Sequence, residues 1–187
     1  PGMRAGMTVA VIGAGGVGLN ALQGAKLMNA SKVIAVDIVD HKLEFAYKFG
    51  ATEVVNSKEQ DPVSAIQKIT GGGVDFAFDT FGHKITTEQA FRATRKGGTT
   101  VVIGLAPDGM AAGIPLVDIV RNQKTLVGSY YGSASPHETF SKLFEFYRQG
   151  KIDIGSIVTR SYQLDEINEA YGALECGEDG RGVIVFD

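Results

Sequence analysis

The feature that most constrains the fold is an apolar run that leads directly into a glycine-rich turn. Residues Val9–Ile12 are apolar, and the sequence GAGGVG follows them at residues 13–18. A second apolar run, Val33–Val36, ends on Asp37. This order predicts a strand, a glycine turn, a helix and a second strand that ends in an acid.

The glycines of this turn have different geometric roles. Gly13 allows a tight turn, Gly15 lets a pyrophosphate approach the backbone without meeting a Cβ, and Gly18 lets the helix lie close to the sheet. The helix N-terminus offers unpaired N–H groups and a partial positive charge to phosphates. Asp37 can accept hydrogen bonds from both hydroxyls of an adenosine ribose and would repel a 2′-phosphate. The pattern therefore predicts binding of NAD(H) in preference to NADP(H).

The helix after the turn should bury one apolar face. Its apolar residues recur at spacings of four, four and three, which is typical of an amphipathic helix. The residues expected on that face are Val17, Ala21, Ala25 and Met28.

Strand-like and helix-like segments alternate along the chain as far as residue 131. Strands are expected at residues 53–55, 74–79, 99–103 and 125–131, and helices at 40–49, 62–69, 86–94 and 116–120. Asp61 and Pro62 mark one helix start as an N-cap and a first-turn proline. The alternation predicts an α/β fold, a doubly wound parallel six-stranded sheet of the Rossmann type.

The end of the chain has a different pattern. Short strands are expected at residues 157–158 and 183–186, and between them lies an apolar stripe at helical spacing: Leu164, Ile167, Tyr171 and Leu174. We therefore predict a dinucleotide-binding domain at residues 1–132 and a C-terminal helix–strand appendage at 133–187. Because the main sheet is complete without them, the late strands should be mobile, or pair with each other or with a neighbouring chain.

Composition excludes several classes of protein. The net charge of the 187 residues is −3, so no basic surplus indicates a nucleic-acid or anionic-membrane partner. No apolar run approaches the roughly 20 residues of a membrane span, and no signal segment opens the chain. Cys176 is the only cysteine, which excludes an internal disulfide and predicts a cytoplasmic protein. The first residue is Pro1, so we expect a trimmed piece of a longer chain.

Several segments together carry a family likeness. These are VIGAGGVGLNALQGAKL, VIAVDIVDHKLEFAYKFGATEVVN, VDFAFDTFG, VVIGLAP and the closing ECGEDGRGVIVF. They resemble the medium-chain zinc-dependent alcohol dehydrogenases over essentially the whole chain. The resemblance implies that Gly15–Val17 and Arg181 face the pyrophosphate, and that Asp37 and Lys42 face the adenosine ribose. A solvated helix-face lysine is the alternative for Lys42.

The resemblance also implies residues for the other half of the cofactor. Thr80–Gly82 would lie near the adenine side and the nicotinamide ribose, and Ile103–Leu105 with Tyr131 would hold the nicotinamide carboxamide. Thr80 and Ile103 are otherwise ordinary strand-end residues. The full set of predicted cofactor-binding residues is Gly13, Gly15, Gly16, Val17, Gly18, Asp37, Lys42, Thr80, Phe81, Gly82, Ile103, Gly104, Leu105, Tyr131 and Arg181.

The chain departs from the family in its metal chemistry. In the family, three zinc ligands and the proton-relay hydroxyl precede this domain. Cys176, His41, His83 and His137 are widely separated and lack ligand spacing. We therefore predict no metal site and no catalytic residue in this chain, with zinc only in the parent. Cys176 is expected to be a packed apolar group, and His41 and His83 polar loop residues.

The resemblance implies an oxidoreductase that moves a hydride between an alcohol or aldehyde and nicotinamide. The chain alone would bind NAD(H) without turnover. Three alternatives remain: a zinc-independent reductase of quinones or enones, an S-adenosylmethionine-dependent methyltransferase and a non-catalytic NAD sensor. The strand at residues 125–131 should form a sheet edge, through which we expect a homodimer.

Overall fold

The glycine turn leaves the central strand of a six-stranded parallel sheet in the computed structural model, which describes residues 2–177 and 180–186. The strand order is β3-β2-β1-β4-β5-β6. The strands are β1 (Thr8–Ile12), β2 (Lys32–Asp37), β3 (Glu53–Asn56), β4 (Val74–Asp79), β5 (Thr94–Val102) and β6 (Thr125–Gly128). This order confirms the predicted doubly wound sheet.

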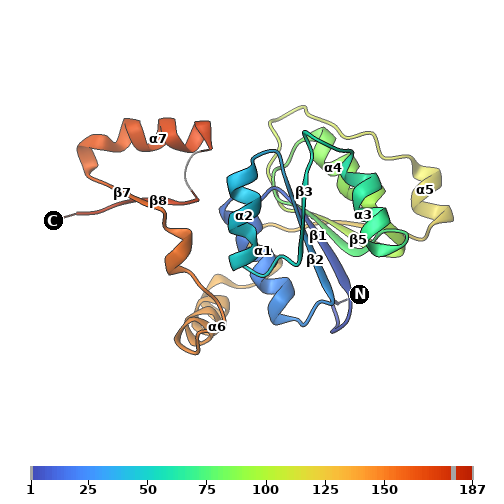
Figure 1. Cartoon of the computed structure of the whole chain (residues 1–187), viewed down its shortest axis with the longest axis horizontal. Coiled ribbons are helices and arrows are strands. Elements are labelled where there is room, and N and C mark those ends of the chain that lie inside the picture. The colour runs from blue at the N-terminus through green and yellow to red at the C-terminus, as the bar shows by residue number, and fades with distance from the viewer. Residues whose placement is uncertain (1, 178–179, 187) are drawn as a thin grey trace. The chain divides into compact units, whose positions relative to one another are not determined.

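Helices cover both faces of this sheet (Figure 1). Ala10 and Ile12 of β1 pack with Ile66 and Ala90, from the helices of one face. All residues of β1 after Thr8 are buried, as expected for a parallel strand with both faces covered. The helices are α1 (Gly16–Leu27), α2 (Asp40–Lys48), α3 (Pro62–Thr70), α4 (Lys84–Ala93) and the short α5 (Leu116–Arg121).

The predicted apolar face of α1 was wrong in part. Val17 and Met28 are 46% and 47% exposed, and the buried apolar residues are Leu19, Leu22 and Ala25. The buried face begins at Gly18, which has no apolar side chain to mark it. The prediction therefore took the preceding residue, Val17, as the start of the face. The N-cap prediction was confirmed, because a carboxylate oxygen of Asp61 accepts a hydrogen bond from the Ser64 N–H at 2.8 Å.

The predicted boundary between α4 and β5 was also wrong. The helix ends at Ala93 and the strand begins at Thr94, which pairs with Val74 before the register shifts. A Cβ at Gly98 would lie 2.6 Å from the Thr94 methyl carbon and 2.9 Å from the carbonyl oxygen of Asp75. Gly98 therefore belongs to a bulge inside the strand, in the segment 95–98 that was expected to connect the helix to the strand.

The sixth strand is shorter than predicted. It ends at Gly128, and residues Tyr131–Ser133 form a 3₁₀ turn, η1. Tyr131, Gly132 and Ser133 have φ values of 48°, 72° and 53°. A strand requires negative φ, so the chain cannot continue the sheet through these residues.

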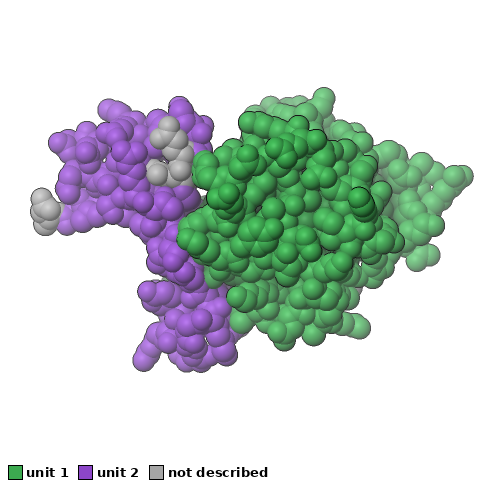
Figure 2. Space-filling view, viewed as in Figure 1, with its two compact units in different colours: residues 1–138 green, residues 139–187 purple. Residues whose placement is uncertain are grey.

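The chain divides into two units, Pro1–Glu138 and Thr139–Asp187 (Figure 2). The helix α6 (Pro136–Arg148) crosses the boundary; after it come η2 (Gly155–Ile157), β7 (Arg160–Tyr162), η3 (Leu164–Glu166), α7 (Ile167–Cys176) and β8 (Gly182–Ile184). The strand expected at residues 157–158 was wrong, because η2 ends there. β7 and β8 form a separate parallel pair, so these strands pair with each other. Within the described ranges, no helix is long and apolar enough to cross a bilayer.

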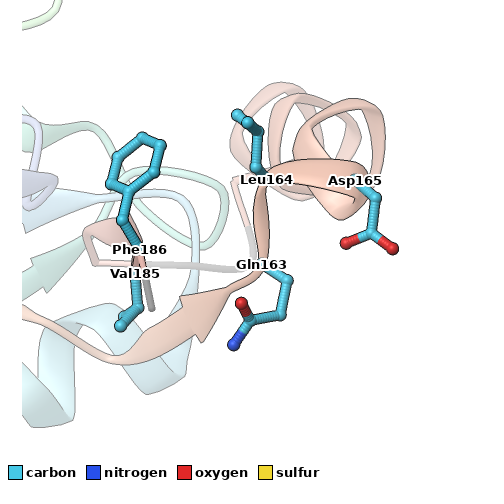
Figure 3. A pocket seen from close by; sticks show the side chains of 5 residues that line it. All are labelled: Gln163, Leu164, Asp165, Val185 and Phe186. Atoms are coloured by element: carbon cyan, nitrogen blue, oxygen red, sulfur yellow. The ribbon is translucent and has the colours of Figure 1, made fainter.

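A pocket in the second unit is lined by residues of η3 and of the segment after β8 (Figure 3). Its lining residues are Gln163, Leu164, Asp165, Val185 and Phe186. The Asp165 carboxylate points away from the Phe186 ring in Figure 3. None of the predicted cofactor-binding residues lines this pocket.

Asp75 joins three strands at the end of the sheet where β4 begins. Its carboxylate accepts hydrogen bonds from the Thr8 N–H at 2.8 Å, the Thr8 hydroxyl at 2.9 Å and the Arg95 Nε–H at 2.7 Å. Burial raises the pKa of Asp75, but the bonds from Thr8 and Arg95 outweigh it and hold this pKa below 3.8. The ionised form therefore stabilises the fold above the unfolded-state pKa, and this stability is lost as pH falls through the folded-state pKa.

We predict that Asp75→Asn lowers the free energy of unfolding at pH 7 by about 1–2 kcal/mol. The difference from the wild type should shrink as pH falls below about 4, because the wild-type carboxyl then becomes neutral as well. Thermal unfolding at pH 7 and pH 3 measures this. Asp108→Asn, at an exposed loop position, is the control. It should leave the stability unchanged at both pH values. An equal loss at both pH values would contradict the prediction.

Candidate cofactor-binding site

The loops that follow β1, β4 and β5 meet at one end of the sheet. Ile12 pairs with Val36 on one side and with Asp79 on the other, and Asp79 pairs with Val102. The connection from β1 leads to β2, whereas the connection from β4 leads to β5, so the chain turns in opposite directions at this point. Open parallel sheets bind ligands at such a switch point, outside the carboxyl ends of their strands.

Two glycines make the first turn possible. Gly13 has a φ of 98°, which a residue with a side chain rarely adopts. A Cβ at Gly18 would collide with the carbonyl oxygen of Gly13 and lie 3.1 Å from the Thr80 hydroxyl oxygen. The first turn of α1 therefore lies directly against the backbone that leaves β1.

The N-terminus of α1 is open to a ligand. Gly15 is its N-cap, and a Cβ there would meet nothing within 4 Å. The first turn has no acidic residue and no side-chain cap. Among the described residues, the N–H groups of Gly16, Val17 and Gly18 have no acceptor, and Leu19 makes the first bond of the helix, to Gly15. Such amides, at the positive end of a helix, suit a phosphate.

The carboxylate of Asp37 is held against the turn by backbone amides. One oxygen accepts the Ala14 N–H at 2.7 Å, and the other accepts the N–H groups of Ile38 at 2.8 Å and Val39 at 3.1 Å. A carboxylate has about four acceptor positions, so these three donors leave room for about one more. Two ribose hydroxyls would have to share an oxygen or replace an amide. The side chain is half-buried and remains accessible.

Lys42 lies on the first turns of α2, and its side chain is half-buried. Its ammonium group has no hydrogen bond or ion pair with any part of the chain that the structure describes. Thr80 is already engaged, because its hydroxyl lies 3.0 Å from the carbonyl oxygen of Ile12 and 2.9 Å from that of Gly13. Thr80 therefore ties the end of β4 to the glycine turn.

The loops after β4 and β5 touch through their backbones. A Cβ at Gly82 would collide with Gly104, and a Cβ at Gly104 would collide with Gly82 and Phe81. Phe81 and Leu105, which flank this contact, are 67% and 77% exposed. The two loops thus form a common wall from which two large apolar side chains extend into solvent.

Asp79 is a site residue that the sequence analysis missed. It ends β4 as Asp37 ends β2, but it is fully buried. One oxygen accepts the N–H groups of Phe81 and Gly82, both at 3.1 Å, and the other accepts the Thr87 hydroxyl at 2.6 Å. The sequence VDFAFD, an acid at the end of an apolar strand, was the available signal.

The remaining predicted residues lie in different places. The Ile103 N–H donates to the carbonyl oxygen of Asp79 at 2.8 Å, which fixes the start of its loop. Tyr131 is exposed, and its ring packs edge-on against that of Tyr130, with 4.5 Å between the ring centroids. Arg181 belongs to the second unit, where it lies before β8 and lines a pocket with residues of α7.

The described residues hold no group of three or more metal-ligating side chains. His83 caps α4, because its Nδ1 accepts the Ile85 N–H at 3.2 Å. Cys176 is exposed, so the expected packed position was wrong.

Comparison with known proteins agrees with this geometry. A family model described as zinc-binding dehydrogenase matches residues 16–149. A geraniol dehydrogenase from Carpoglyphus lactis is 37% identical over 97% of this chain and 48% of its own length. The structure of benzyl alcohol dehydrogenase from Acinetobacter calcoaceticus is 38% identical, with a TM-score of 0.95 over 99% of this chain and 51% of that one.

A structure from Sinorhizobium meliloti 1021 is bound to NADP. It is 31% identical, with a TM-score of 0.84 over 90% of this chain and 49% of that one. The chain thus spans about half the length of the relatives that it matches.

We predict that alanine is tolerated at Gly15 and not at Gly18. Gly18→Ala forces the helix away from the turn and should lower the free energy of unfolding by about 3 kcal/mol or more. Gly15→Ala should change it by less than about 1 kcal/mol, because the site is open and φ is −78°. Urea unfolding of both variants measures this, and equal losses would contradict the assigned geometry.

Proposed function

The chain belongs to the medium-chain zinc-dependent alcohol dehydrogenase family, and we propose that it binds NAD(H) where the loops after β1, β4 and β5 meet. The observation that carries this proposal is the open N-terminus of α1. Its uncapped amides and the empty space beside Gly15 fit a diphosphate. The backbone of residues Gly15–Val17 would hold the diphosphate, with Gly13 and Gly18 shaping the turn. Arg181 is proposed as an additional contact from the second unit.

The adenosine ribose would be bound by Asp37 and Lys42. The amides of Ala14, Ile38 and Val39 hold the carboxylate in a fixed orientation. A 2′-phosphate at that place would meet a like charge. Since a related structure is bound to NADP, the fold itself does not exclude that cofactor. The choice of NAD(H) therefore rests on Asp37.

The nicotinamide half would lie against the wall formed by Thr80–Gly82 and Ile103–Leu105, with Tyr131 beside it. Thr80–Gly82 would also lie near the adenine side of the cofactor. The bound nicotinamide would supply the hydride acceptor or donor of the reaction. Exposed apolar side chains at Phe81 and Leu105 suit the flat faces of such a ligand and would exclude water.

For the parent protein we propose hydride transfer between an alcohol or aldehyde and NAD, in the cytoplasm. Relatives named for geraniol and benzyl alcohol support an alcohol substrate. Because the residues described here do not form a zinc site, zinc would have to be held elsewhere in the parent. This chain alone should bind cofactor without turnover. Nothing in the structure favours a methyltransferase, and the family match opposes it.

We predict that the chain binds NADH at least about tenfold more tightly than NADPH, since one repulsive charge contact costs about 1–2 kcal/mol. Titration followed by the fluorescence of the reduced nicotinamide measures both affinities. Asp37→Asn has nearly the same shape and no charge, but its NH₂ group replaces one acceptor oxygen. It should weaken NADH binding somewhat and bring the two affinities to within about threefold. Glu44→Gln, an equal charge change at an exposed position of α2, is the control and should preserve the preference. If NADH gives no saturable change in fluorescence, the proposed function is wrong.

We also propose a homodimer through the free edge of β6. Leu126 and Val127 are each 40% exposed on this edge strand, and an open apolar edge favours pairing. Light scattering should give a dimer for the wild type and a monomer for Val127→Lys. Tyr47→Lys, at an exposed site on α2, should remain dimeric. A monomeric wild type would contradict the proposal.

A further inference from the structure

We propose that Asp79 is a positioning residue that sets the nicotinamide side of the site without touching the cofactor. This inference rests on the proposed function, and it concerns a residue whose side chain is wholly buried. The site contains two acids at strand ends. Asp37 is accessible to a ligand, whereas the oxygens of Asp79 are bonded only to the protein.

Asp79 holds the first loop through its side chain. The N–H groups of Phe81 and Gly82 both donate to one oxygen, which fixes the turn in which Gly82 has a φ of 80°. The other oxygen accepts the Thr87 hydroxyl at 2.6 Å. Because Thr87 lies in the second turn of α4, the loop is held to the helix as well as to the strand.

Asp79 holds the second loop through its main chain. Its carbonyl oxygen accepts the N–H groups of Ile103 at 2.8 Å and Gly104 at 3.1 Å. The loops then meet where Gly82 and Gly104 leave no room for a Cβ. One residue therefore sets the separation of the two segments that are proposed to hold the nicotinamide.

A buried carboxyl group at the end of a strand costs free energy of desolvation. Removing such a group from water costs several kcal/mol unless its oxygens are hydrogen-bonded, and an apolar residue would pack there at no such cost. The side-chain hydrogen bonds of Asp79 all go to the loop after β4 and to α4. The geometry thus points to loop shape as its role, since packing alone would not need a carboxyl group.

The two halves of the cofactor should respond differently to this residue. The ADP half depends on the glycine turn and Asp37, whose hydrogen bonds do not involve the Asp79 side chain. The nicotinamide half depends on the loops that Asp79 sets. ADP-ribose differs from NADH only by the nicotinamide ring, so the ratio of the two affinities isolates the binding of that ring.

The test is calorimetric titration of NADH and ADP-ribose into the purified chain and its variants. Asp79→Ala should weaken NADH binding about tenfold and ADP-ribose binding by less than about twofold. Asp79→Asn keeps an acceptor oxygen for Phe81 and Gly82, so it should retain most of the NADH affinity. Thr87→Val should show a smaller loss of the same kind, and Thr87→Ser should restore it.

Asp75→Asn is the matched control. It alters a hydrogen-bonded carboxylate on the same strand, at the opposite end of the sheet. It should lower stability and leave the ratio of the two affinities unchanged. Circular dichroism establishes that each variant is folded at the temperature of titration.

The outcomes separate the inference from the proposed function. A wild-type chain that binds neither ligand overturns both. A wild type that binds both, with Asp79→Ala losing the two ligands equally, shows a merely structural residue and overturns the inference alone. If Asp79→Ala does not fold, an affinity ratio that Thr87→Val leaves unchanged overturns it.

Discussion

The contact between Gly18 and the carbonyl of Gly13 is the constraint on which the site depends. Since no side chain fits between them, α1 begins directly against the end of β1. Its first amides then point beyond the carboxyl edge of the sheet, and no side chain of the described residues caps them. The Thr80 hydroxyl bonds to the same turn, so the end of β4 is fixed relative to the helix. The close contact between Gly18 and Gly13 thus places the partial positive charge of the α1 N-terminus at the switch point of the sheet.

Two acids with similar surroundings have different uses because their burial differs. Asp37 and Asp79 each follow an apolar strand, and each accepts N–H groups from the residues just after it. Asp37 keeps contact with solvent, so a polar ligand can reach it. Asp79 is covered, and its remaining oxygen is taken by Thr87. The same local chemistry is therefore proposed to provide a recognition group on β2 and a scaffold group on β4.

The sequence predicted those features that depend on local pattern. The parallel six-stranded sheet was predicted from the alternation of apolar runs with helical segments. The Asp61 cap was predicted because an aspartate at this position can accept the N–H three residues ahead. Features that depend on distant backbone were missed. The bulge at Gly98 exists because β4 passes close by, and β6 ends early because Tyr131 and Ser133 adopt positive φ. The buried face of α1 was misplaced because Gly18, which opens it, carries no apolar side chain.

The second unit has much less apolar burial of its own than the first. Of its described residues, only Ile157, Tyr162 and Ala173 are buried apolar side chains, and its sheet has two short strands. A two-stranded sheet with so little apolar burial has marginal stability and opens locally at low cost. In contrast, the uncapped amides and Asp37 lie within the first unit, next to β1 and β2, which are buried along most of their length. The proposed diphosphate site therefore lies within the unit that has the larger buried core.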